Sequence, residues 1–378
     1  MLNYYRKILA SKQSGHLESN AGVDLDLSEK SINRKLDLVN NEMIHQLNLG
    51  TVHETHARKL IEDIQLYGKS ALISLRDSNK APLLPPEQLS ATLEAIVKFD
   101  GTRPTFLINN GEVNLSSSIT TSWQDSLYVS RDLLRQVIPS VGRISSSAEE
   151  GSAIGTGFLI SETLLVTNRH VLQKIACRND EKGKWEFFGG ASVDFVKEYG
   201  STDSDSVEFV SVVFAGPNAV RLQIDHQIND IAIFELNLKP KTLIRPFKLR
   251  SFAPREDIEI YTIGYPSMPD IRDYPLDVLD SLFEKGFDVK RLAPGKLMGK
   301  EASLPEWSFC HDATTLGGNS GSVVMEIGKE DVVAGLHYGG ASKDPRRNYA
   351  HNIALLEEED NYSGLSLGET LRAYHINM

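Results

Sequence analysis

The first third of the chain places apolar side chains at steps of three and four residues, the spacing of one face of an α-helix. This pattern predicts helices over residues 28–48, from Thr55, from Pro86 to Gly101 and from Ser122 to Ile138. In the first of these the apolar stripe consists of Ile32, Leu36, Val39, Met43 and Leu47. Only the run Thr105–Ile108, followed by Asn-Asn-Gly, suggests a strand and a tight turn in this region.

From Ser140 onward the pattern changes to short apolar runs separated by Gly, Asn, Asp and Pro. Many short strands at this spacing indicate an all-β barrel or sandwich rather than a parallel α/β sheet. The runs that predict strands are Val141–Ile144, Gly157–Ile160, Leu164–Thr167, Val207–Phe214, Ile231–Leu236, Ile258–Ile263 and Val332–Leu336. A last helix is predicted around Leu367, Leu371 and Tyr374. The expected organisation is a helical module (1–121), a β domain (122–362) and a helical tail (363–378).

Composition narrows the class of protein. A hydrophobic content of 40% and a charged content of 24% are ordinary for a globular protein with a full core. The formal net charge of −11 argues against a nucleic-acid partner, because phosphate affinity comes from clustered Lys and Arg. No apolar stretch approaches the ~20 residues that span a bilayer, and the first twenty residues lack the apolar core of a secretory signal. With two cysteines, Cys177 and Cys310, the chain is expected in a reducing compartment, the cytoplasm, and away from membranes.

A histidine and an aspartate each lie at the edge of an apolar strand. His170 follows the run Leu164–Thr167, where an imidazole held at a barrel rim can act as general base. Asp230 opens the run Ile231–Leu236, an awkward place for a carboxylate unless it has a partner. Asp225 is the rival aspartate, but it is not coupled to the apolar strand. A triad needs such an acid to accept the histidine Nδ1 proton and so fix the working tautomer.

The serine candidate lies in the glycine-rich run Leu316-Gly317-Gly318-Asn319-Ser320-Gly321-Ser322, which an apolar strand follows at once. Glycines on either side of one serine let the backbone turn sharply and direct amide hydrogens inward. The amides of Gly318 and Ser320 are predicted to form an oxyanion hole. Ser322 is the other serine of this run and is not the predicted nucleophile. A plain turn is the alternative for this run taken alone.

The combination of the three segments decides between these interpretations. His170, Asp230 and Ser320 occur in that order, 60 and then 90 residues apart, across a region that reads as β throughout. The order differs from the Asp-His-Ser and Ser-Asp-His arrangements of other serine hydrolase folds. We therefore predict a catalytic triad of His170, Asp230 and Ser320.

These motifs resemble those of bacterial trypsin-like peptidases, in particular the branch that contains glutamyl endopeptidases and high-temperature-requirement proteases. Thr167-Asn168-Arg169-His170-Val171 is similar to the histidine motif of that branch, and Gly318–Ser322 to its serine motif. The resemblance covers roughly residues 102–357 and implies an all-β, chymotrypsin-like double β-barrel protease domain after the small helical module. No Ile-Val-Gly-Gly start is present, so activation by a freed N-terminal amine is not expected.

The resemblance also bears on specificity. Thr314, six residues before the serine, stands where trypsin-like enzymes that select Lys or Arg carry an acid. Glutamyl endopeptidases use a histidine in the pocket strand and a threonine five residues before the serine, and His337 and Thr315 match those places. Tyr338 and Gly339 continue the strand and are expected to contact substrate. This implies cleavage after Glu or Asp, because imidazole and hydroxyl groups can bind a carboxylate.

A small apolar pocket, in which His337 and Tyr338 are packing residues, is the alternative for that strand. His311-Asp312 is interpreted as part of the wall of the serine loop. The run His53-Glu54-Thr55-His56 lacks the two-residue spacing between glutamate and second histidine that a zinc protease motif requires. No metal or organic cofactor is therefore expected.

The predicted function is intracellular serine endopeptidase, acting on protein or peptide substrates through an acyl-enzyme. The helical module is expected to sense a trigger or protein partner, recruit a substrate or hold the barrel inactive; a simple cap over the barrel is the alternative. A different class of function also remains: a catalytically latent adaptor that captures an extended peptide by strand addition.

Overall fold

The computed structural model describes residues 27–376 with gaps, the longest of which is 268–285. The chain divides into two compact units. We name the first the helical unit (residues 1–104, 117–122 and 270–285) and the second the barrel unit (105–116, 123–269 and 286–378). The hairpin near residue 108 and the C-terminal tail therefore belong with the barrels, whereas the sequence places its domain boundaries at 121 and 362.

Two helices make up most of the described part of the helical unit, α2 (Glu29–Asn48) and α3 (Glu54–Arg76). Gly68 lets them approach closely, because a Cβ there would lie 2.6 Å from Leu36. One cluster of buried apolar side chains in this unit consists of Leu27, Ile32, Ala71, Leu72, Leu75, Leu89, Leu93 and Ile96. Within the described residues, none of the helices is long and apolar enough to cross a membrane. The helix predicted from Pro86 to Gly101 lies largely outside the described residues.

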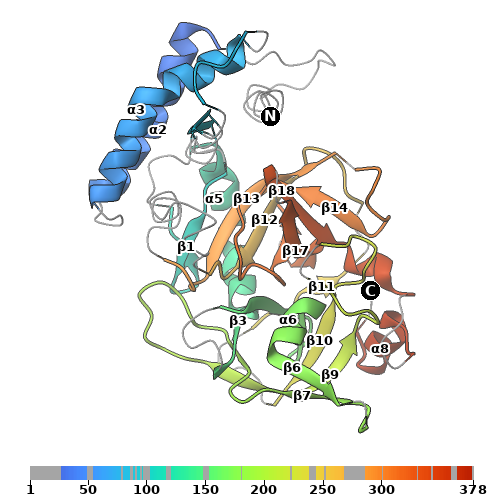
Figure 1. Cartoon of the computed structure of the whole chain (residues 1–378). Coiled ribbons are helices and arrows are strands. Elements are labelled where there is room, and N and C mark those ends of the chain that lie inside the picture. The colour runs from blue at the N-terminus through green and yellow to red at the C-terminus, as the bar shows by residue number, and fades with distance from the viewer. Residues whose placement is uncertain are drawn as a thin grey trace. The chain divides into compact units, whose positions relative to one another are not determined.

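The first barrel is closed and has six strands in the order β10-β5-β4-β3-β8-β9. All neighbouring pairs are antiparallel. The strands are β3 (Val141–Ser145), β4 (Gly155–Leu159), β5 (Leu164–Thr167), β8 (Ser192–Asp194), β9 (Ser206–Ala215) and β10 (Ala232–Leu236). Figure 1 shows this barrel in green and yellow.

The second barrel has the order β12-β15-β17-β18-β14-β13 and is closed by the pairing of β12 with β13. Its strands are β12 (Glu259–Gly264), β13 (Arg291–Met298), β14 (Ser308–His311), β15 (Val323–Glu326), β17 (Gly335–Ala341) and β18 (Asp344–His351). The hairpin of β1 (Phe106–Asn109) and β2 (Glu112–Val113) extends it beside β13. Two six-stranded barrels after a helical segment confirm the predicted fold class (Figure 1).

The remaining elements connect or cover the barrels. They are α5 (Thr121–Val137), η1 (Ile138–Ser140), α6 (Arg169–Ile175), β6 (Ala176–Asn179), β7 (Lys184–Phe187), β11 (Lys248–Leu249), β16 (Val332–Val333), η3 (Ile353–Leu356) and α8 (Leu367–Ala373). The apolar face of α5 joins the core that both barrels share. Helix α8 has a capping box, in which Ser366 and Glu369 satisfy each other's backbone amides.

Two local predictions differ from the structure. The run Val332–Leu336 is not one strand, because Ala334 donates its N–H to Val324 and separates β16 from β17. The segment after β5 is a short helix, α6, which was not predicted because the run before it has the pattern of a strand. His170 therefore lies in the first turn of a helix rather than on a strand end.

A buried cation ties the hairpin, the first barrel and β13 together. Lys290 is fully buried, and its Nζ donates to the carbonyls of Phe195 (2.7 Å) and Ile138 (3.1 Å). It also lies 3.4 Å from Glu198, whose other oxygen accepts the Gly111 N–H over 2.8 Å. Burial lowers the pKa of Lys290 to about 8. Removal of this side chain leaves a buried carboxylate and two carbonyls without their partner.

We expect Lys290→Met to lower the free energy of unfolding by about 3–5 kcal/mol, the usual cost of breaking a buried pair from one side. Lys329→Met is the matched control, because Lys329 pairs with Glu326 on the surface, with 60% of its side chain exposed. The control should change stability by less than about 1 kcal/mol. Urea unfolding of the variants and the wild type measures both values. Equal effects would show that the buried cluster contributes no more than a surface pair.

Candidate active site

His170 and Asp230 meet because they flank two strands that pair with each other. Thr167, at the end of β5, lies opposite Ala232, at the start of β10. The residues just beyond these two ends therefore lie on the same rim of the first barrel. His170 Nδ1 is 2.7 Å from Asp230 Oδ2, and the His170 N–H donates to Asp230 Oδ1 over 2.9 Å.

Asp230 is held from every side. Its N–H donates to His351 Nε2 over 3.3 Å, and its carbonyl accepts from Asn168 Nδ2 over 2.9 Å. Burial works to raise the pKa of Asp230, but the charge and hydrogen bonds of His170 outweigh it, so the pKa lies below the usual value. The carboxylate therefore stays ionised at neutral pH and fixes the proton of His170 on Nδ1, which leaves Nε2 as the basic nitrogen. Asp225, the rival candidate, instead accepts the Gln227 N–H in a local turn.

The serine loop is fastened to the same rim. Thr156 donates its N–H to the carbonyl of Ser320 over 2.8 Å, and Gly321 donates to the carbonyl of His337 over 2.9 Å. Gly321 has φ +89°, and a Cβ there would lie 2.5 Å from Thr167 Oγ1. Only glycine allows this approach, which sets Ser320 against the ends of β4 and β5, next to the start of α6.

Four successive carbonyls of the serine loop each accept a hydrogen bond. The donors are Ser267 N to Gly317 O (2.8 Å), Thr156 Oγ1 to Gly318 O (2.8 Å), Ser322 N to Asn319 O (2.9 Å) and Thr156 N to Ser320 O (2.8 Å). The backbone N–H groups of the same loop alternate between bonded and unbonded. The Asn319 N–H is bonded to Leu316 O and the Gly321 N–H to His337 O, whereas those of Gly318 and Ser320 donate to no protein atom in the described part of the chain. These are the two amides that the sequence assigns to an oxyanion hole.

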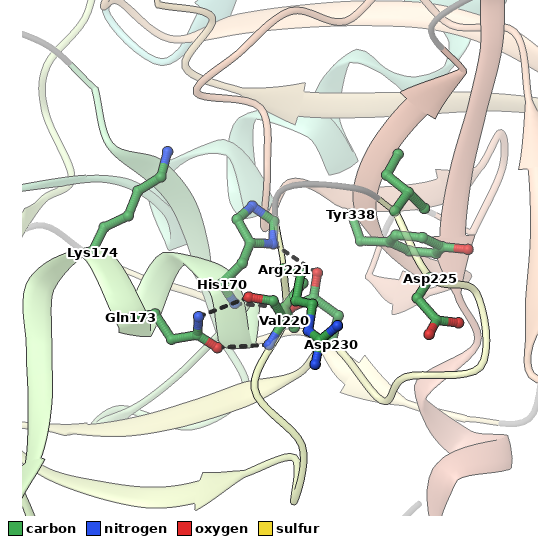
Figure 2. A pocket seen from close by; sticks show the side chains of 9 residues that line it. His170, Gln173, Lys174, Val220, Arg221, Asp225, Asp230 and Tyr338 are labelled. Atoms are coloured by element: carbon green, nitrogen blue, oxygen red, sulfur yellow. Dashed lines mark hydrogen bonds and ion pairs between the residues drawn. The ribbon is translucent and has the colours of Figure 1, made fainter.

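A cleft of about 810 Å³ opens beside this pair (Figure 2). His170, Asp230 and Tyr338 line it, together with the loop before β10. Gln173, one turn after His170 on α6, anchors that loop with two bonds to the backbone of Val220, of 2.9 and 2.8 Å (Figure 2). The helix that carries the histidine thus also positions a wall of the cleft.

The predicted pocket residues are only partly as expected. His337 is buried, and its Nδ1 lies 3.3 Å from His311 Nε2. His311 is the last residue of β14 and is fully buried, so it is not part of a loop wall as the sequence suggested. Thr315 donates its hydroxyl hydrogen to Asn348 over 2.6 Å. Its hydroxyl can therefore accept, but not donate, without breaking this bond.

Tyr338 lines the cleft, whereas the neighbouring Gly339 is not among the residues that line it. The Tyr338 ring stacks on His351 with 4.0 Å between the ring centroids, and its hydroxyl lies 2.9 Å from His226 Nδ1. A Cβ at Gly339 would lie 2.8 Å from the end of the Ile224 side chain, which also lines the cleft. Tyr338 packs and lines the cleft at the same time, which unites the two interpretations of this residue.

Three positioning residues were not found from the sequence: Thr156, Gln173 and His351. The sequence could have indicated Thr156 as a positioning residue, since it stands between two glycines at the start of an apolar strand. Nothing in the sequence indicates the roles of His351 and Gln173, because their partners lie 121 and 47 residues away along the chain.

Comparison with known proteins bears on the class of enzyme. Residues 155–334 match the family model of the trypsin-like peptidase domain. Over these residues the barrel unit is similar to trypsin-like peptidase domains. The chain is also 28% identical over 360 residues to a probable serine protease of Lysobacter enzymogenes, an alignment that covers 88% of this chain and 87% of that protein. The predicted class of enzyme, a serine protease of the trypsin-like family, is thereby confirmed.

Solved structures similar to this trypsin-like enzyme include mouse neuropsin, a serine protease, at 15% identity and a TM-score of 0.42. That alignment covers 57% of this chain and 90% of neuropsin. A Glu endopeptidase is 19% identical with a TM-score of 0.40, and the alignment covers 57% of this chain and 86% of that one. The preference for acidic residues stays a prediction.

Gly318 offers a test of the serine loop of this protease. A Cβ at this position would lie 2.3 Å from the Tyr265 carbonyl, on a backbone with φ +81°. We expect Gly318→Ala to slow casein hydrolysis by at least about 100-fold, the loss typical of one oxyanion donor. Initial rates with fluorescently labelled casein measure the effect.

Gly328→Ala is the control, because Gly328 has a similar φ of +86° but open space around the Cβ position. It carries the same backbone strain, about 1–3 kcal/mol, without the contact. Its rate should stay within about twofold of the wild type, as for most changes away from a site. Equal losses in the two variants would show that strain alone explains the effect.

Proposed function

We propose that this chain is an endopeptidase that cleaves peptide bonds through an acyl-enzyme on Ser320. His170 Nε2 takes the Ser320 hydroxyl proton while Oγ attacks the scissile carbonyl carbon, and Asp230 stabilises the imidazolium that forms. The amides of Gly318 and Ser320 bind the oxygen that becomes negative. His170 then gives its proton to the leaving amine. A water molecule, deprotonated by His170 in the same way, hydrolyses the ester and restores the Ser320 hydroxyl.

The observation that carries this proposal is the pattern of hydrogen bonds from Gly317 to Ser320. A trans peptide points its N–H opposite to its C=O, so a held carbonyl fixes the direction of the amide. Two amides are thereby left available next to one serine, on the rim that bears the His170–Asp230 pair. A peptide-binding adaptor has no chemical need for this arrangement, which favours the enzyme over the latent alternative.

We also propose a preference for Glu or Asp before the scissile bond, with His337 as the recognition residue. Burial, and the charges of His311 and His170, hold the pKa of His337 well below its usual value, and burial lowers the pKa of His311 to about 4. Both rings are therefore neutral at pH 7, and one of them must donate to the other. Nδ1 of His311 is buried without a partner.

An unpartnered buried acceptor is tolerated better than an unpartnered buried N–H. The favoured tautomer therefore has the proton of His311 on Nε2, donating to His337 Nδ1. His337 then carries its own proton on Nε2 and can donate it to a carboxylate oxygen. Thr315 supports this less well, because its hydroxyl hydrogen already goes to Asn348.

The cellular setting is a proposal of the same kind. Neither the exposed Cys177 nor the buried Cys310 is in a disulfide bond, which suits a reducing compartment such as the cytoplasm. A protease in that setting needs restraint. We propose that the helical unit supplies it by responding to a trigger or a protein partner.

Ser320→Ala tests the catalytic assignment. We expect the wild type, but not this variant, to react with a fluorophosphonate probe and to cleave unfolded casein, because the nucleophile is gone. Ser322→Ala should retain both activities, since that hydroxyl is buried and lies 3.4 Å from Asn319 Oδ1. Labelling without casein cleavage would support a formed site that awaits a trigger. Absence of both in the wild type would favour the adaptor.

His337→Gln tests the specificity. The wild type is expected to cut a denatured proteome mainly after Glu and Asp, and the variant to lose that enrichment while it keeps the fluorophosphonate reaction. The physical reason is the loss of the donor relay from His311, which a glutamine cannot reproduce with the same geometry. Sequencing of the new peptide termini measures the preference. Cleavage by the wild type without acidic enrichment would contradict the assignment.

A further inference from the structure

The peptide group between Gly317 and Gly318 is held by a residue of another loop. Ser267, three residues beyond the end of β12, donates its backbone N–H to Gly317 O over 2.8 Å. We propose that this amide is the latch that keeps the Gly318 N–H in the oxyanion hole, which makes Ser267 a positioning residue. The inference rests on the proposed function, since it explains what maintains that same site.

The turn geometry shows what the latch selects. The Asn319 N–H donates to Leu316 O over 3.1 Å, and Gly318, the third residue of this turn, has φ +81°. Gly317 is not among the residues with positive φ. These features define a type II turn. In a type I turn the same end-to-end bond forms, but Gly318 has negative φ and the central peptide is rotated by roughly half a turn.

The two turns place opposite groups in the oxyanion hole. In the type II turn Gly317 O faces Ser267 and the Gly318 N–H faces the other way. In the type I turn Gly317 O would enter the hole, where it repels a developing oxyanion, and the Gly318 N–H would face the N–H of Ser267. Glycine at both central positions allows either form. The hydrogen bond from Ser267 therefore distinguishes a working hole from a blocked one.

Ser267 is itself fixed by its two preceding residues. The Tyr265 N–H donates to Thr156 Oγ1 over 3.0 Å, and the Pro266 carbonyl accepts the Asp288 N–H over 2.8 Å. The proline ring also locks φ at position 266. The latch is thus connected to β4 of the first barrel and to the segment that precedes β13.

Ser267→Pro in the full chain tests the proposal, because proline removes the N–H. We expect its maximal rate of fluorophosphonate labelling to fall by about 10- to 100-fold, below the 100- to 1,000-fold loss on deleting an oxyanion donor outright. The half-saturating probe concentration should stay within about threefold, because oxyanion contacts act mainly in the transition state. Ser267→Ala keeps the backbone N–H, so this variant should label at the wild-type rate. A Ser267→Pro chain that labels at the wild-type rate overturns the proposal.

A crystal structure separates this inference from the proposed function. In the Ser320→Ala background, Ser267→Pro is expected to show the Gly317–Gly318 peptide reversed, with negative φ at Gly318. An unchanged peptide overturns the latch even if the wild type is an active protease. A reversed peptide supports it even if the wild type fails to react with the probe, which would instead refute the proposed function.

A second variant covers the case in which Ser267→Pro does not fold, as judged by circular dichroism. Pro266→Gly keeps every donor but frees the backbone just before the latch. Its maximal labelling rate should fall by about three- to tenfold, a smaller loss than the missing N–H causes, because the bond is weakened rather than deleted. A Pro266→Gly chain that labels at the wild-type rate overturns the proposal.

Discussion

The arrangement of the cleft depends on the hydrogen bonds of one buried threonine. Thr156 on β4 donates its N–H to Ser320 O and its hydroxyl to Gly318 O, while its own oxygen atoms accept from Tyr265 and from Thr167 Oγ1. A residue of the first barrel thereby holds the serine loop of the second. Because Thr156 also bonds to Thr167 at the end of β5, the strand that leads to His170, the His170–Asp230 pair and the serine share a single framework.

Charge imposes a second constraint on the same region. Asp230 is a buried carboxylate. Its ionised form is stabilised by the His170 ring and by the hydrogen bond that it accepts from the backbone N–H of His170. The other histidines nearby stay neutral, because burial lowers the pKa of His351 to about 4 and holds that of His337 well below normal. Since the pKa of Asp230 is lowered, this pairing stabilises the fold above the unfolded pKa and is lost as the pH falls through the folded one. At neutral pH His170 therefore faces one negative charge and no competing cation from these rings.

The parts of the molecule that the sequence predicts well are those that local pattern determines. Strands such as β5, the helix α5 and the meeting of His170 with Asp230 follow from apolar runs and from the order of motifs along the chain. Residues whose partners are remote could not be predicted. The apolar run before His170 conceals α6, and nothing in the neighbourhood of His337 announces His311 as its partner. The contact between His311 and His337 arises only because β14 and β17 both pair with β18.

The same distinction explains why the serine motif alone is ambiguous. Glycines around Ser320 permit the turn that a protease needs, but they permit the reversed turn equally well, and a short glycine-rich run is a common plain turn. What removes the ambiguity lies elsewhere in the chain: the Ser267 amide against Gly317, and Thr156 against the two carbonyls that follow. A motif supplies the conformational freedom and the fold restricts it. Catalytic competence is therefore a property of the packed barrels, and a chain with the motif but without these donors would lack a formed oxyanion hole.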